Sequence, residues 1–169
     1  YKILIMVIIA AVGMAIVGVR GAVSIQNANE QMARMYADDM HSVELLGQAC
    51  EKMRTIQVRS MQVIADASRL EELSKSQAKD INDMEALLGE YASLAAGDGN
   101  DAAVQEMMGY WESFRRSMPA VMSAVKSGGS EAGIAEYDRA ARQDTVKLRD
   151  SLTALSNATR EAAFEANQQ

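Results

Sequence analysis

The chain has 169 residues, 23 acidic and 17 Lys or Arg side chains, a net charge of −6 and one cysteine. This length can bury one domain core, the acidic balance argues against a nucleic-acid partner, and a single cysteine excludes an internal disulfide. Twelve methionines, one proline and 5 % aromatic residues are typical of a mostly helical protein.

The first segment is strongly apolar. Residues 3–19, "ILIMVIIAAVGMAIVGV", carry no charge and lie between Lys2 and Arg20. A membrane span needs about 17–25 such residues, and no clean signal-peptidase site follows. We predict a transmembrane helix over residues 1–20 and a periplasmic domain over residues 21–169, anchored in the inner membrane. The alternatives are a cleaved signal peptide and a helix buried in a soluble core.

Four helices are predicted after the span, over residues 21–67, 69–96, 101–126 and 131–169. Ser68 with Glu71 forms a capping-box pattern, and Gly-rich segments at 97–101 and 127–133 separate the later helices. Apolar residues recur at helical spacing in each. Short connections make neighbouring helices antiparallel, so the fold class is all-α, an up-down-up-down four-helix bundle. Pro119 is expected to kink the third helix. The chain begins with Tyr, so we expect a fragment of a longer protein, with a second span after the last helix.

The first bundle helix carries two apolar strips on a helical wheel. One is centred on Cys50, and the other contains Leu45, Ala49, Ile56 and Val63. A helix of a lone bundle needs only one such strip, so the second is predicted to pack against another subunit. The predicted state is therefore a homodimer.

Arg54 and Arg59 stand out in the stretch "MRTIQVRSMQV" (53–63). Five residues on a helix separate side chains by about 140°, so we expect one helix to be unable to hold one anion between them. Across a two-fold axis, Arg54 of one subunit and Arg59 of its partner converge. Arginine binds carboxylates bidentately, which predicts a small anionic ligand at the dimer interface. Gln57 and Ser60 form a polar layer nearby, and Arg142 lies at the same depth on the fourth helix.

This pattern resembles the periplasmic sensor domain of bacterial methyl-accepting chemotaxis receptors. The resemblance covers the whole chain: an N-terminal span, a four-helix bundle and two arginines five apart. In aspartate- and serine-sensing members a third arginine follows four residues later, where this chain has Val63. The resemblance implies an organic acid or amino acid as ligand, and signalling by helix displacement. It also implies a contact from a threonine of the fourth helix, for which Thr145 is the candidate.

Other interpretations remain open. Arg54 and Arg59 are also compatible with a different role, as solvated surface charges or as ion-pair partners of acids such as Glu51. His41 with Asp38 and Glu44 has metal-like spacing, but a lone histidine beside carboxylates is usually a surface residue. The sequence contains no nucleophile–base set and no glycine-rich phosphate-binding loop, so we expect neither enzymatic activity nor a bound cofactor. The alternative functions are an anchored structural or protein-binding bundle, and the sensor of a histidine kinase or nucleotide cyclase. The ligand, the output domain and delivery by a binding protein are left open.

Overall fold

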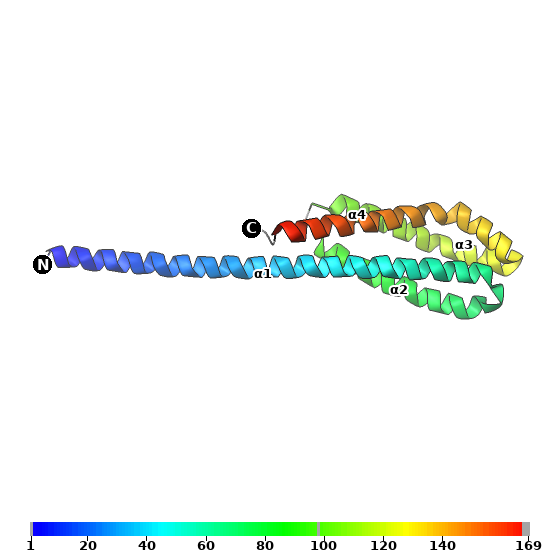
Figure 1. Cartoon of the computed structure of the whole chain (residues 1–169), viewed down its shortest axis with the longest axis horizontal. Helices are drawn as coiled ribbons and strands as arrows, with labels where there is room; N and C mark the ends of the chain where they lie inside the picture. Colours follow the sequence, from blue (N-terminus) through cyan, green and yellow to red (C-terminus); the bar gives the residue numbers. More distant parts are fainter. Residues whose placement is uncertain (1, 98, 167–169) are drawn as a thin grey trace. The chain divides into compact units, whose positions relative to one another are not determined.

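The computed structural model describes the backbone of residues 2–97 and 99–166. Side chains are described for residues 37–97 and 99–164, together with 20, 24–26, 29 and 33. The elements in chain order are α1 (Lys2–Ala65), a short 3-10 helix η1 (Ala67–Arg69), α2 (Leu70–Leu94), α3 (Asp101–Ala140) and α4 (Arg142–Ala166) (Figure 1). Every element in this described part is a helix, which confirms the all-α prediction.

The chain divides into two units, Tyr1–Asp38 and Asp39–Gln169. The first unit contains the N-terminal part of α1, and the second contains the bundle. No helix in the described part is both long and apolar enough to cross a membrane. The side chains of the predicted span, over residues 1–20, lie outside the described ones except for Arg20, so the span stays a prediction.

Asp66 shapes the connection from α1 to α2. Its carboxylate accepts hydrogen bonds from the Ser68 backbone N–H, at 3.1 Å, and from the Ser68 hydroxyl. An acidic side chain that caps the first N–H groups of a turn stabilises it. Asp66 therefore caps η1, whereas the N-cap position of α2 is Arg69, which makes no side-chain capping hydrogen bond. The capping box predicted for Ser68 and Glu71 is not formed, and Glu71 lies within the first turn of α2.

The chain reverses direction inside α3, at Gly129 (φ 72°, ψ −160°). This backbone conformation is accessible essentially to glycine alone. The reversal confirms the predicted break at residues 127–133. The non-helical dihedrals within α3 lie at Gly129, and Pro119 lies inside the helix, so the predicted kink at Pro119 stays a prediction. A further irregularity, at Ala141, separates α3 from α4 (φ −123°, ψ −30°).

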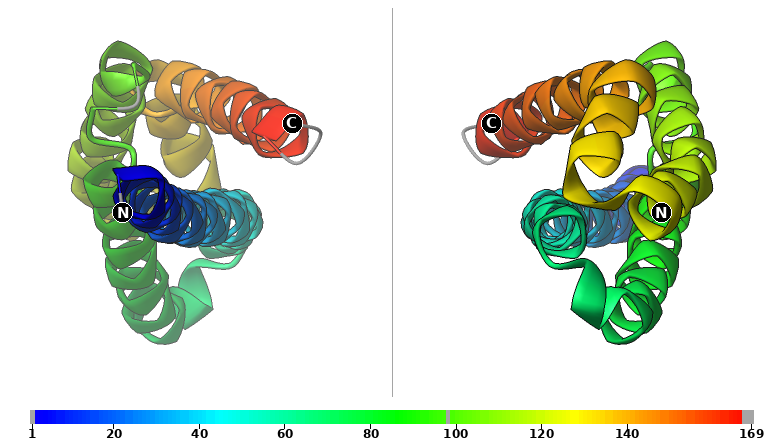
Figure 2. Two further views of the ribbon diagram at one scale, coloured as in Figure 1. Left: turned by 90° about the vertical axis from the view of Figure 1, so that its left-hand side faces the viewer. Right: turned by 90° about the vertical axis from the view of Figure 1, so that its right-hand side faces the viewer.

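The buried residues of each helix follow a spacing of three and four, typical of bundle packing. Figure 2 looks along the bundle, with α4 (orange to red) and the cyan part of α1 on one side and α2 and α3 (green) on the other. Trp111, Phe114 and Met118 are the centre of the α3 contribution. The described buried residues of α1 are Ser42, Leu45, Leu46, Ala49, Met53, Ile56, Ser60, Val63 and Ile64.

The second apolar strip of α1 is buried in the chain's own core. Leu45, Ala49, Ile56 and Val63 are each at most 3 % exposed. The two predicted strips are the two edges of one buried face, which is wide because α1 packs against more than one neighbouring helix. The strip therefore cannot form the predicted contact with a second subunit.

Gly133 allows the two halves of the α3 hairpin to approach α1. A Cβ atom there would lie 2.4 Å from Val125 Cγ2 and 3.5 Å from Ile64. Gly133→Ala should therefore destabilise the bundle by about 1–3 kcal/mol through overpacking. In thermal denaturation, adding Val125→Ala should restore part of the loss. A double variant less stable than Gly133→Ala would show that the clash with Val125 is not the cause.

Candidate functional site

A surface groove of about 300 Å³ runs along the outward side of α1. Its lining residues all belong to this one helix: Arg54, Thr55, Val58, Arg59 and Gln62. Two guanidinium groups and the Gln62 amide can donate hydrogen bonds here, and Val58 supplies an apolar surface. The Thr55 hydroxyl donates to the Glu51 carbonyl at 3.1 Å, so it offers a ligand only its acceptor lone pairs. This combination suits a small anion with a short carbon skeleton.

The structure brings Arg54 and Arg59 to the same groove within one chain. Arg54 and Arg59 are about 140° apart on a helical wheel, and the exposed side of α1 lies between them. Long side chains at the two edges of this side can both reach over it. The expectation that one helix cannot offer both arginines to one anion is therefore not supported.

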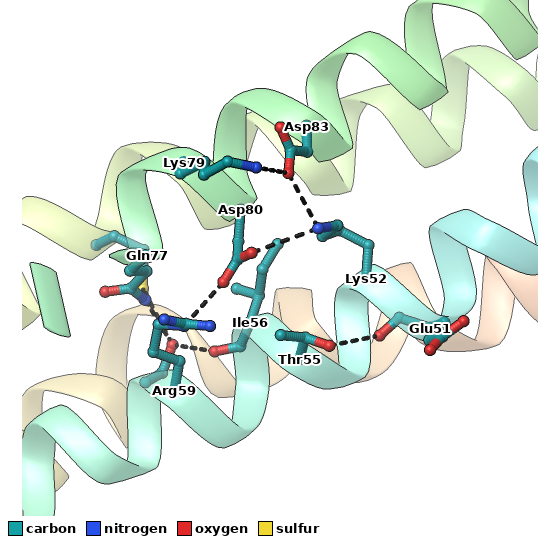
Figure 3. A network of polar contacts seen from close by, with 11 residues as sticks. Glu51, Lys52, Thr55, Ile56, Arg59, Gln77, Lys79, Asp80 and Asp83 are labelled. Carbon is teal, nitrogen blue, oxygen red and sulfur yellow. Dashed lines mark hydrogen bonds and ion pairs between the residues drawn. The ribbon is translucent and has the colours of Figure 1, made fainter. Parts of the chain in front are cut away.

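Arg59 also belongs to an ion-pair cluster between α1 and α2 (Figure 3). Its Nε lies 2.8 Å from Oδ2 of Asp80, whose side chain is 9 % exposed. The geometry of this contact does not qualify as a hydrogen bond, so the contact is an ion pair. Lys52 contacts Oδ1 of Asp80 at 3.4 Å and Asp83 at 3.0 Å, and Lys79 contacts Asp83 at 2.9 Å.

The cluster shifts the titration of its members. Hydrogen bonds from Lys79 and Lys52 lower the pKa of Asp83. The hydrogen bond to Asp83 is the main reason why the pKa of Lys52 is raised. Both groups are therefore held in their charged forms at neutral pH.

The remaining predicted site residues lie away from the groove. Ser60 is 1 % exposed; its hydroxyl donates to the Ile56 carbonyl at 2.8 Å and accepts from Gln77 Nε2 at 2.7 Å. Thr145 is 4 % exposed and donates to the Ala141 carbonyl at 2.8 Å. These two side chains stabilise the core. Their predicted contact with a ligand stays untested.

Gln57 is partly buried and is not among the residues that line the groove. Arg142 is exposed on α4, with its Nε 3.0 Å from Asp138 Oδ1. The sequence analysis missed Thr55, Val58, Gln62 and Asp80. The signal for Val58 and Gln62 was available, because they follow Arg54 at four and eight residues and so share its side of the helix.

A second groove, of about 460 Å³, lies between α3 and α4. Its cation, Lys147, lies over the Tyr110 ring at 5.3 Å from the centroid. Glu106 and Asp150 also line this groove. Two carboxylates beside one cation make it a poorer site for an anion than the groove on α1.

His41 and Cys50 form no metal site in the described part of the chain, where no group of three potential metal ligands occurs. His41 Nε2 lies 2.9 Å from Glu90 Oε1 and so links α1 to α2. Burial raises the pKa of the Cys50 thiol, against the opposing charges of Arg160 and Arg54. The thiol is thereby kept protonated and unreactive at neutral pH.

Comparison with known proteins matches the sequence to one family. The model of the four helix bundle sensory module for signal transduction matches residues 1–169, which is the whole chain. A search of curated proteins finds no match. The family agrees with the helical bundle and confirms the resemblance to chemotaxis receptors that the sequence indicated. The chain therefore belongs to the family of four-helix-bundle sensory modules for signal transduction.

Proposed function

We propose that this chain is the periplasmic sensor of an inner-membrane chemoreceptor, which binds a small carboxylate-bearing ligand, an organic acid or amino acid, between Arg54 and Arg59. The observation that carries the proposal is the groove on α1, because two guanidinium groups, the amide of Gln62 and the apolar side chain of Val58 line it together. The ligand would bind two arrangements of the bundle helices with different affinities and so shift the balance between them. The predicted membrane span would carry this displacement of helices inward as the signal.

A second copy of the chain is the proposed cover of this groove. A groove walled by one helix leaves a ligand open to water on the other side. The outward residues of α1 repeat at alternating intervals of four and three, which is the spacing of a coiled-coil contact. They are Met40, Glu44, Gly47, Glu51, Arg54, Val58, Met61 and Ala65. Met40, Val58 and Met61 are 46 %, 53 % and 44 % exposed, so this face offers apolar area to a partner helix.

Calorimetry on the 169-residue chain in lipid nanodiscs tests the proposal. The probes are acetate, succinate, L-malate, citrate, L-aspartate and L-serine. We expect at least one to bind, and Arg54→Ala or Arg59→Ala to weaken it by about 10- to 100-fold, the value of a charge-assisted contact. Arg69→Ala is the matched control, because Arg69 is 53 % exposed and pairs with Glu72. Equal affinity in the wild type and both groove variants would contradict the proposal.

Mixed dimers test whether each ligand is held by one subunit. The structure places both arginines in one groove, so mixing Arg54→Ala with Arg59→Ala subunits should restore no binding. A dimer of one wild-type subunit and one subunit lacking both arginines should keep one site. The opposite pair of results would support the arrangement expected from the sequence, with the two arginines contributed by different subunits.

A further inference from the structure

The carboxylate of Asp80 occupies an unusual position in the bundle. On α2 it lies in the series of buried residues that includes Leu73, Gln77, Met84 and Leu88. These core positions are normally apolar, and a charge placed there is costly unless it is paired. Asp80 is only 7 % exposed, so its charge depends on the cations that α1 supplies.

Two cations of α1 neutralise Asp80, and they are one heptad apart. Lys52 and Arg59 lie seven residues apart on α1, and so point to the same side of the helix. Figure 3 shows Asp80 between them. Lys52 has a second acid within reach, Asp83, whereas Asp80 is the acid that contacts Arg59 in the described part of the chain.

The contact uses the inner edge of the Arg59 guanidinium. Nε, the atom nearest to the helix, is the one 2.8 Å from Asp80, and it is buried. The Arg59 side chain as a whole is 27 % exposed and lines the groove on α1. A guanidinium has five N–H donors in a rigid plane, so an anchor at Nε leaves terminal donors for another anion.

We propose that Asp80 is a positioning residue for ligand recognition, which fixes the Arg59 guanidinium in the groove before the ligand arrives. This inference rests on the function proposed above. An arginine that is already ordered loses less conformational freedom when the ligand binds, so the anchor raises affinity without touching the ligand. It also connects the groove on α1 directly to α2.

The chain offers a matched pair of variants. Asp80→Asn keeps the shape of the side chain and removes the charge that holds Arg59. Asp83→Asn makes the same change on α2 beside the same lysine, but leaves Arg59 untouched. In calorimetry with the tightest of the six probe acids, Asp80→Asn should bind about 3- to 10-fold more weakly, because the ligand must then order Arg59 itself. Asp83→Asn should bind like the wild type.

A double-mutant cycle separates positioning from a general loss of structure. In an Arg59→Ala background, Asp80→Asn should have no further effect on affinity, because it acts through Arg59. An unchanged or increased affinity of Asp80→Asn, or an equal loss in both backgrounds, would overturn the inference. An increase would show that Asp80 competes with the ligand for Arg59.

A ligand-free measurement keeps the inference separate from the proposed function. The Arg59 Nε–H resonance, identified by its loss in Arg59→Lys, should have a high NMR order parameter in the wild type and in Asp83→Asn, because the ion pair orders the guanidinium. The order parameter should fall in Asp80→Asn. If it falls but none of the six acids binds the wild type, the anchor exists and the proposed function fails. If it is equal in all three proteins, the positioning role fails whatever binds.

Discussion

Replacing Ile56 by glutamate is expected to unfold the bundle. Ile56 is 0 % exposed and lies in the buried series of α1. The substitution removes the burial of a large apolar side chain and places a carboxylate where no cation was arranged for it. The combined cost, about 4–8 kcal/mol, approaches the total stability of a typical domain. Circular dichroism should show loss of the cooperative thermal transition, or a melting temperature lowered by tens of degrees.

Val58→Glu is the control on the opposite side of the same helix. Val58 is 53 % exposed, so its melting temperature should stay close to that of the wild type. Because Val58 lies on the proposed contact face, this variant should instead weaken self-association in analytical ultracentrifugation. A stable, weakly associating Ile56→Glu would restore the interpretation of its strip as a subunit interface.

Truncating Trp111 to alanine is expected to cost about 3–5 kcal/mol of unfolding free energy. Trp111 is 2 % exposed in the bundle core, and its ring stacks on Phe114 with centroids 5.9 Å apart. The loss should appear as a lower midpoint in urea denaturation, with little change in the slope of the transition.

Trp111→Phe should cost far less, about 1.5 kcal/mol or below. The buried indole N–H has no hydrogen-bond partner among the described residues, so phenylalanine removes a donor that the core does not satisfy. A loss in Trp111→Phe as large as in Trp111→Ala would mean that the indole N–H contributes through a contact not seen in this structure.

The helical segments could be predicted because the residues that end them act locally. Gly97 and Gly129 both have positive φ, a conformation that glycine adopts readily and that its presence in the sequence indicates. Core residues were harder to predict at the edges of the buried face of each helix. Met61 lies eleven residues after Cys50 and so on the first predicted strip, yet it is 44 % exposed. A helical wheel drawn at 3.6 residues per turn drifts relative to the 3.5-residue repeat of packed helices. Residues at the margin of the buried face are therefore assigned to the wrong side of the helix.

The candidate site was predicted only in part, because the contacts among its residues depend on how the helices pack together. Arg54 and Arg59 were identifiable as unusual charges on one helix. Their meeting in a single groove depends on how far their side chains reach, which a wheel does not represent. Asp80 lies on a different helix, and its contact with Arg59 follows from the register between α1 and α2. Sequence periodicity predicts which face of a helix is buried, but it does not set this register.

The single-residue reversal at Gly129 has a consequence for the order of folding. The two halves of the hairpin that it joins approach each other across as few as eight residues, at Val125 and Gly133, whereas the hydrogen bonds of Ser60 join α1 to Gln77 of α2 across 17 residues and to Met118 of α3 across 58. Loops that close over few residues lose little chain entropy and form quickly. We therefore expect the hairpin around Gly129 to form early and to serve as the template on which α1 docks. A bulky residue at Gly129 would then slow folding itself, beyond the strain that it adds to the native state.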